Sequence, residues 1–301
     1  MPHVNHKIAR TSCIRSAGCN PPVYGRAMKT AIDSQSPARY TAGFTLIELA
    51  ITLAIVGVLA GAVLVPFVAQ VAQRNTAATE KTLEQIREAL LGFATATGRL
   101  PCPASAMSNG VEVFDVATGG NIANGKCENF MGFLPAATLG FTPVDSQGYA
   151  IDGWGTAKNR IRYAVSNQPV NGPGGPVTNP FTRANGMRSA TAAALAGAQL
   201  LYVCASGAPS ADPVVHCGPG AVGSGGSVTL TSTAPLVVWS AGANAATGGI
   251  SVDEAQNNFN ADRTFVSHPV TTVAGNEFDD IVTWVAVGNL VSRMVLGGQM
   301  P

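Results

Sequence analysis

The chain has 301 residues, of which only 12% are charged, with 18 Lys and Arg side chains against 17 Asp and Glu. The net charge of +1 excludes an overall basic field that would hold nucleic acid by counterion release. A hydrophobic fraction of 46% excludes global disorder.

The first 43 residues form a basic segment. They carry six Lys or Arg side chains and one acid, Asp33. A basic segment that precedes an apolar run stays on the cytoplasmic side of a membrane, so we expect a cytoplasmic N-terminus. Residues 1–43 would make a long leader, whereas a start at Met28 would leave a leader of 16 residues. We expect translation to begin at Met28, with a start at Met1 as the alternative.

An apolar run of 24 residues, 44–67, follows the leader and contains one charge, Glu48. As a helix it would be about 36 Å long, enough to cross a hydrocarbon core of about 30 Å, so we expect a transmembrane segment. A cleaved secretory signal has a shorter apolar region. A plain membrane anchor does not explain the acid, because a carboxylate is costly in lipid and marks function. Pro66 removes a backbone hydrogen bond and predicts a kink in the helix.

The residues around this acid resemble a known processing site. Gly43-Phe44-Thr45-Leu46-Ile47-Glu48 resembles the prepilin site of type IV pilins and type II secretion pseudopilins, and Pro66 lies where many such proteins have a proline. The resemblance implies that a prepilin peptidase cleaves between Gly43 and Phe44 and methylates the new amino terminus. Pairing this Phe44 ammonium with Glu48 of a neighbouring subunit would relieve two charges that are costly in lipid.

Beyond Pro66, a stripe of side chains recurs at alternating spacings of three and four, which is typical of one helix face. The stripe consists of Ala69, Ala72, Thr76, Thr79, Leu83, Ile86, Leu90 and Phe93. Gly98 and Pro101 end it. We expect one helix over 44–97, membrane-spanning in its first half and amphipathic in its second half. The second half should pack on a globular head while the first half projects from it; a free coiled coil is the alternative.

The remaining residues, 98–301, predict an antiparallel β-sheet head, because short β-type runs alternate with Gly, Pro and Asn. Strands are expected at 111–116, 160–166, 199–205, 227–233, 235–240 and 281–287, short helices at 189–197 and 290–296, and loops at 171–175 and 218–226. Phrases at 98–104, 152–155, 237–244 and 278–285 also resemble large pseudopilin-like proteins. The expected fold class is therefore α+β and pilin-like.

Four cysteines follow the leader: Cys102, Cys127, Cys204 and Cys217. An even number in an oxidising compartment predicts two disulfides, of three possible connectivities. We expect the nearest-neighbour pairs Cys102–Cys127 and Cys204–Cys217. Reactive or metal-binding cysteines are the alternative, although the chain contains no CxxC motif.

No enzymatic motif stands out. Residues 218–223 match GxGxxG, but a β-like run follows where a dinucleotide fingerprint requires a helix. HExxH, GxSxG and Walker motifs are absent, and only His216 and His268 follow the leader. We expect no catalytic site and no cofactor. Calcium is the alternative, since four acids could supply oxygen ligands: Asp145, Asp152, Asp279 and Asp280.

With these patterns, the resemblance implies a structural subunit, a minor pilin of a type IV pilus or a pseudopilin of a type II secretion system. The expected partners are a prepilin peptidase, other pilin or pseudopilin subunits and an inner-membrane assembly platform, with no nucleic acid. The chain would cross the inner membrane once, with its head in the periplasm, and then enter a fibre. An adhesin or cargo-binding head on a pilin stem is the alternative function. A membrane-anchored enzyme is a third, for which the sequence offers no site.

Overall fold

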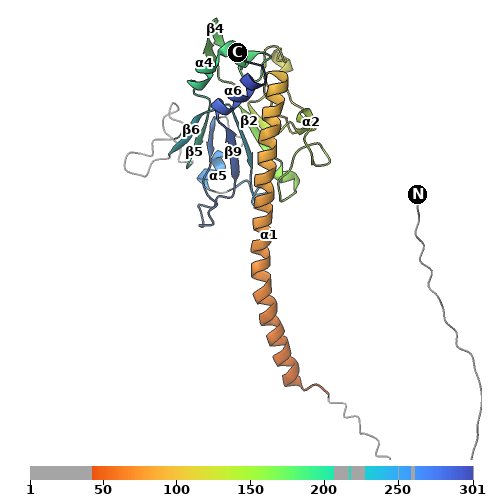
Figure 1. Ribbon diagram of the computed structural model, residues 1–301. Helices are drawn as coiled ribbons and strands as arrows, with labels where there is room; N and C mark the ends of the chain where they lie inside the picture. The colour runs from red at the N-terminus through yellow and green to blue at the C-terminus, as the bar shows by residue number, and fades with distance from the viewer. Residues whose placement is uncertain (1–42, 207–216, 218–227, 250, 259–261, 301) are drawn as a thin grey trace, which may run out of the picture. The chain divides into compact units, whose positions relative to one another are not determined.

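The computed structural model describes residues 43–206, 217, 228–249, 251–258 and 262–300, except for the side chains of residues 62–69. The fold is α+β, with a long N-terminal helix followed by short strands and helices (Figure 1). The chain divides into two compact units between Val56 and Gly57, inside this first helix. The leader residues 1–42, including the alternative start at Met28, lie outside the described residues.

The first helix, α1 (Leu46–Thr97), runs for 52 residues and corresponds to the helix expected over 44–97. It ends as expected at Gly98, which has a positive φ of 75° and donates its N–H to the Ala94 carbonyl at 2.8 Å. The helix continues through Pro66, whose side chain lies outside the described residues, so the kink there stays a prediction.

Across the described residues, no helix is both long enough and apolar enough to cross a membrane. The transmembrane segment expected over 44–67 is therefore not confirmed, and the side chains of its residues 62–67 lie outside the description.

A four-stranded antiparallel sheet forms the centre of the head. Its strands lie in the order β1-β2-β7-β9 and span Met131–Phe133, Arg162–Val165, Leu236–Ser240 and Ile281–Val285. Every residue of β2 and β7 is buried. Alternate side chains of β7 enter different cores, with Leu236 and Val238 in one and Val237 and Trp239 in the other. The sheet is therefore covered on both faces, which explains the continuous apolar sequence of β7.

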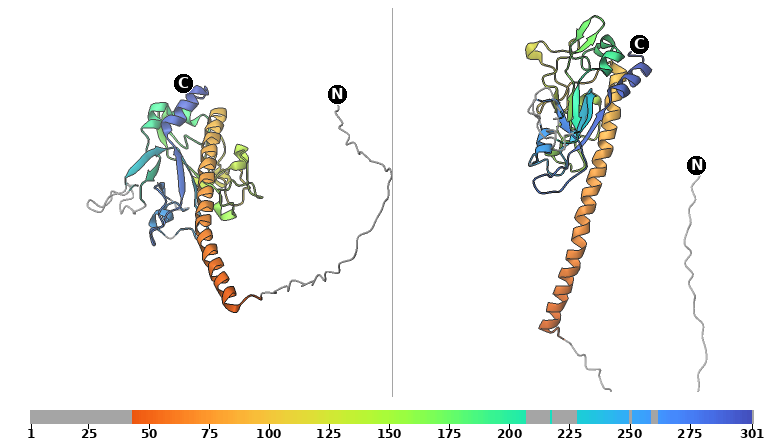
Figure 2. Two further views of the ribbon diagram at one scale, coloured as in Figure 1. Left: turned by 60° about the horizontal axis from the view of Figure 1, so that its bottom comes forward. Right: turned by 90° about the vertical axis from the view of Figure 1, so that its left-hand side faces the viewer.

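The C-terminal half of α1 covers one face of this sheet (Figure 2). Leu83, Ile86 and Leu90 are buried together with Val238 of β7. The expected stripe is thus confirmed in this region, but Ala72 is exposed, because the packed face begins only at Thr79. The helix α6 (Val287–Leu296) joins the same core and corresponds to the helix expected at 290–296. The coiled-coil alternative is wrong for this half of α1, since its apolar face packs on the head of its own chain.

A polar contact fixes the depth at which α1 lies on the head. The buried Thr79 hydroxyl donates to the Asn75 carbonyl at 2.8 Å and accepts from the Gly153 N–H at 2.9 Å. A Cβ on Gly153 would lie 2.3 Å from the Asn75 carbonyl oxygen. Only glycine allows this close approach, which gives the glycine of the 152–155 phrase a packing role.

A second sheet covers the other face of the central sheet. Its order is β6-β5-β8, with strands Thr229–Ala234, Leu201–Cys204 and Thr264–Val266. Phe265 of β8 contacts Trp239 edge to face, with ring centroids 5.0 Å apart. The β5 and β8 strands are parallel, so the expectation of a wholly antiparallel head is wrong here. Parallel pairing requires a long crossover, and the intervening chain supplies it through β6, β7 and α5 (Val252–Gln256).

The shorter elements agree with the sequence expectations in part. The strands expected at 160–166, 199–205, 227–233, 235–240 and 281–287 are present as β2, β5, β6, β7 and β9, with ends within two residues. The loop expected at 171–175 contains the turn of a hairpin between β3 (Val170–Gly172) and β4 (Gly175–Val177). The helix expected at 189–197 is divided into α3 (Gly186–Ala190) and α4 (Ala192–Ala196), because Thr191 adopts a φ of 61°. The remaining short helices are α2 (Ala136–Leu139), η1 (Val116–Thr118) and η2 (Ala157–Asn159). The loop expected at 218–226 lies outside the described residues.

The strand expected at 111–116 is wrong. This segment makes only isolated bridges, Ala104 with Glu112 and Phe114 with Cys127. Glu112 is instead held by a buried ion pair with Arg99, at 2.6 Å, and by the Cys102 N–H, at 3.0 Å. These contacts hold residues 111–116 against the chain that follows α1. The segment therefore forms no continuous series of backbone hydrogen bonds with a neighbouring strand.

Candidate functional site: the N-terminal end of α1

The start of α1 is set by a side-chain cap. The Thr45 hydroxyl accepts a hydrogen bond from the Glu48 N–H at 3.2 Å, and the Thr45 carbonyl accepts from the Leu49 N–H at 3.1 Å. Thr45 and Glu48 have the Thr-x-x-Glu spacing of a capping box, of which the structure forms the threonine half. This role of Thr45 was missed in the sequence analysis, although the spacing signals it. The cap places the first helical residue at Leu46.

The expected cleavage junction lies just outside the helix. Gly43 and Phe44 have no regular secondary structure, and a Cβ added to Gly43 would meet no atom within 4 Å. Phe44 is 80% exposed. A peptide bond outside a hydrogen-bonded helix can enter a protease cleft without first breaking helical hydrogen bonds. The geometry of the junction is therefore open to a peptidase.

Glu48 lies one turn into α1 and is exposed. Within the described part of the chain, no hydrogen bond or ion pair engages its carboxylate. The acid also sits in the first turn of the helix, where the macrodipole favours a negative charge. Its carboxylate is thus open to a cation from another molecule.

The surface around Glu48 is apolar and exposed. Large aliphatic side chains on all sides of α1 are more than half exposed to solvent: Leu46, Ile47, Leu49, Ile51, Leu53, Ile55, Val56, Val58 and Leu59. Apolar area of this extent, left uncovered in water, marks a surface that binds lipid or another protein.

Two disulfides lie in the head, Cys102–Cys127 and Cys204–Cys217, each with a Cα–Cα distance of 5.4 Å. They match the nearest-neighbour pairs expected from the sequence. Cys102–Cys127 joins the chain after α1 to the segment before β1. Cys204 is the last residue of β5. Of the loop that the Cys204–Cys217 disulfide closes, residues 207–216 lie outside the described residues.

The four aspartates considered for calcium do not form one site. Asp145 pairs with Arg160 at 2.8 Å, whereas Asp152 accepts hydrogen bonds from the Ser240 hydroxyl at 2.5 Å and the Asn159 amide at 3.0 Å. The pKa of Asp152 is raised by burial. Among the described residues, no group of three or more His, Cys, Asp or Glu side chains could hold a metal ion.

Asp279 and Asp280 belong to a buried acidic cluster with Glu254 of α5. Glu254 accepts from the Asn244 amide at 2.8 Å and from the Asp279 N–H at 3.1 Å. Burial, together with the neighbouring Glu254, raises the pKa of Asp279 to about 6. Burial raises the pKa of Asp280 to about 7. The cluster was not expected from the sequence, because Glu254 lies in a short helix about 25 residues before Asp279 and Asp280, with no motif around it.

His268 is the only histidine among the described residues. The His268 Nε2 atom lies 3.0 Å from the Asp253 carboxylate, and its ring stacks on Phe278 with centroids 3.9 Å apart. His216 and the GxGxxG segment at 218–223 lie outside the described residues.

Comparison with known proteins identifies the N-terminal segment. A family profile described as the prokaryotic N-terminal methylation motif matches residues 38–64, which contain Gly43, Phe44 and Glu48. Neither the curated proteins nor the solved structures compared gave a match to this chain. The chain therefore carries a prepilin signal of the type IV pilin and pseudopilin kind.

Proposed function

We propose that this protein is a pilin-like structural subunit, a minor pilin or pseudopilin of a type IV pilus or of a type II secretion pseudopilus. The observation that carries the proposal is the geometry of the methylation motif. An unstructured Gly43–Phe44 junction directly precedes a capped helix whose first turn presents Glu48 in an exposed apolar surface. The role is structural, and the protein is a substrate of the prepilin peptidase rather than an enzyme.

Processing is proposed to divide the chain into three parts. Residues 1–43 are a leader removed by the peptidase, 44–97 form the assembly helix and 98–301 form the head. The basic leader supports a cytoplasmic N-terminus, with the head in the periplasm. The motif and the exposed apolar side chains of α1 support an inner-membrane stage before an assembly platform transfers the subunit into the fibre.

In the fibre, the Phe44 ammonium of one subunit is proposed to pair with Glu48 of a neighbour. The support is that Glu48 has no partner in the described part of its own chain. Apolar side chains of neighbouring helices would cover the aliphatic surface and remove water from the pair. A charge-assisted hydrogen bond in such surroundings is stronger than in water. The pair would then set the register at which each subunit joins the fibre.

The test of processing is mass spectrometry of membrane-extracted protein, made with and without the peptidase. We expect an N-methylated Phe44 terminus when the peptidase is present, and a peptide spanning Gly43–Phe44 only when it is absent. An intact spanning peptide as the main species in the presence of the peptidase would contradict the proposal.

The test of assembly compares Glu48→Ala with Glu80→Ala, an exposed acid on the same helix. Leaving one charge of a buried pair alone costs roughly 3–5 kcal/mol, so Glu48→Ala should be cleaved normally but fail to enter fibres. The Glu80→Ala protein should be cleaved and incorporated. Normal incorporation of the Glu48→Ala protein would refute the pairing role and leave the processing result standing.

A further inference from the structure

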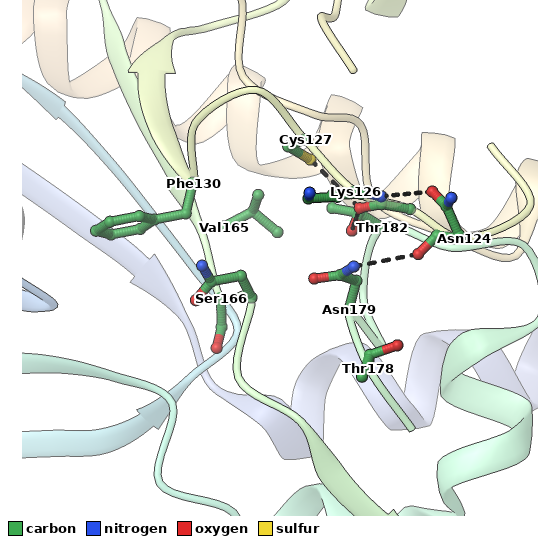
Figure 3. Close-up of a pocket in the computed structure, with 11 residues that line it drawn as sticks. Asn124, Lys126, Cys127, Phe130, Val165, Ser166, Thr178, Asn179 and Thr182 are labelled. Atoms are coloured by element: carbon green, nitrogen blue, oxygen red, sulfur yellow. Dashed lines mark hydrogen bonds between the residues drawn. The ribbon is translucent and has the colours of Figure 1, made fainter. Parts of the chain in front are cut away.

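A pocket in the head lies outside everything that the proposed function uses. It has a volume of about 440 Å³ and opens between the segment before β1, the end of β2 and the chain after β4 (Figure 3). This volume is in the range of roughly 300–1,000 Å³ that is usual for small-molecule sites. Its walls come from three segments far apart in the sequence, around Lys126, Ser166 and Asn179.

The walls are polar but carry no free charge. Amide and hydroxyl side chains dominate them: Asn124, Ser166, Asn167, Thr178, Asn179 and Thr182. Among the lining residues, Lys126 is the only charged one that the structure describes. Its ammonium lies 3.1 Å from the Asp115 carboxylate and also donates to the Thr118 hydroxyl, so this cation already has two partners. A phosphate or carboxylate ligand would find no unpaired cation here, and the pocket therefore favours a neutral ligand.

The position of the polar groups is held by the surrounding chain. The Thr182 hydroxyl, which is buried, donates to the Gly125 carbonyl at 2.6 Å, and the Asn179 amide nitrogen donates to the Asn124 carbonyl at 3.2 Å. The Cys102–Cys127 disulfide anchors the same segment. The pocket walls are thus pre-organised, which lowers the entropic cost of binding.

Asn179 presents an acceptor to the pocket. Its backbone has a φ of 48°, and its amide nitrogen is turned toward Asn124. Figure 3 shows the amide oxygen on the opposite side, facing Ser166 across the pocket. Within the described residues this oxygen has no hydrogen-bond partner. A fixed amide whose nitrogen is already engaged leaves a directed acceptor for a ligand hydroxyl.

An aromatic residue, Phe130, borders the pocket at one side (Figure 3). Phe130 lines this pocket and also a second pocket of about 650 Å³, whose lining includes Pro103, Met131 and Phe133. Phe130 therefore lies between a polar hollow and a more apolar one. A ligand with several linked rings could place one ring on each side of it.

We propose that these two pockets form a binding site for a neutral oligosaccharide. A sugar ring has hydroxyls that both donate and accept, and apolar C–H faces that pack on an aromatic ring. The amides and hydroxyls of the first pocket match the sugar hydroxyls, and the Glu128 carboxylate of the second pocket is a further acceptor for them. Phe130, which lines both pockets, offers the aromatic face. A phosphorylated ligand or a nucleic acid would require unpaired cations, whereas Lys126 is paired with Asp115 and Glu128 adds a negative charge. The inference concerns the head alone, so it does not depend on fibre assembly.

The experiment titrates the full chain, purified in a detergent without a sugar headgroup, with maltotriose, cellotriose and triacetylchitotriose, and follows binding by calorimetry. Trigalacturonate and trialanine serve as charged and peptide comparisons. We expect saturable binding of at least one neutral trisaccharide with a Kd below about 5 mM. Absence of saturable binding by all three, or binding of only trigalacturonate or trialanine, would overturn the proposal.

Variants locate the site. Asn179→Gly keeps the positive φ and removes the amide, so we expect at least a tenfold weaker Kd. Phe130→Leu keeps an apolar side chain and removes the ring face, and should weaken binding about fivefold. Asn109→Gly is the matched control, since Asn109 also has a positive φ, of 52°, but lines neither pocket. Circular dichroism verifies the fold of each variant. Unchanged affinity in folded Asn179→Gly protein, or an equal loss in Asn109→Gly protein, would refute the assignment.

Discussion

The buried carboxyl group of Asp280 predicts a pH dependence of stability that can be measured directly. Asp280 is 7% exposed, and burial raises its pKa to about 7. The Asn257 amide, which donates to it at 2.8 Å, and the positive charge of Arg162 oppose this rise, whereas Glu254 and Asp279 add to it. Arg162 is itself buried, and burial lowers its pKa. The environment therefore favours the neutral acid below about pH 7.

The sign of the effect follows from proton linkage. In the unfolded chain, Asp280 loses its proton near its ordinary pKa of 3.8, but in the folded chain it keeps the proton until about pH 7. Between these values the folded state binds more protons, so the free energy of unfolding falls as the pH rises. The contribution is fully present below about pH 4 and is lost above about pH 7. The difference between the two pKa values corresponds to about 4 kcal/mol, as an order of magnitude.

The perturbation is Asp280→Asn, which keeps an oxygen for the Asn257 amide and cannot ionise. Thermal or urea unfolding is followed by tryptophan fluorescence, to which buried Trp239 contributes, at several values between about pH 4 and about pH 8. The free energy of unfolding of the variant, relative to that of the wild type, should rise by a few kcal/mol across this range. A difference that does not change with pH would refute the reasoning.

A contrasting variant checks the sign. Two backbone N–H groups and the Arg160 guanidinium hold the pKa of Asp145 below its ordinary value, against the opposing effect of burial. Asp145 therefore stabilises the fold above about pH 4 and loses this contribution as the pH falls through its folded pKa. Asp145→Asn should therefore remove a rise of the free energy of unfolding with pH, which is opposite in sign to the effect of Asp280 and occurs at more acidic pH. Equal pH profiles for the two variants would show that a general charge effect, and not burial of Asp280, is responsible.

Three further predictions concern the stability of the head. Ile86→Ala removes a fully buried side chain between α1 and the sheet. It should lower the free energy of unfolding by about 2–5 kcal/mol in urea titrations, whereas a loss below about 1 kcal/mol would mean that this half of α1 is not packed as described. Replacing Cys102 and Cys127 together by Ser removes a disulfide between residues 25 apart in the sequence. The free energy of unfolding should fall by about 3 kcal/mol, measured by thermal unfolding without reductant. An unchanged unfolding midpoint would contradict the disulfide. Glu112→Gln leaves the buried Arg99 guanidinium without its carboxylate. The free energy of unfolding should fall by on the order of 3 kcal/mol in the same assay. An unchanged free energy of unfolding would mean that the ion pair is exposed to solvent.

The elements that depend on near neighbours could be predicted from the sequence. The spacing of Leu83, Ile86 and Leu90 defines one helix face, because residues three and four apart lie together within a turn. Gly98 signals the end of the helix, since it supplies the left-handed conformation of a C-terminal cap. The continuous apolar run of β7 likewise indicates a buried strand. The prepilin signal belongs to this group, because its residues are contiguous from Gly43 to Glu48.

The contacts between distant segments were decided only by the tertiary structure. Nothing near Thr79 indicates that its hydroxyl meets Gly153, 74 residues away, and nothing near Glu112 indicates that it pairs with Arg99 rather than extending a strand. Parallel pairing of β5 with β8 requires the path of the whole intervening chain. The raised pKa of Asp280 depends in the same way on which groups from other elements surround it. Local periodicity depends on residues that are close in the sequence, whereas burial and charge environment arise only when the fold brings separate segments together.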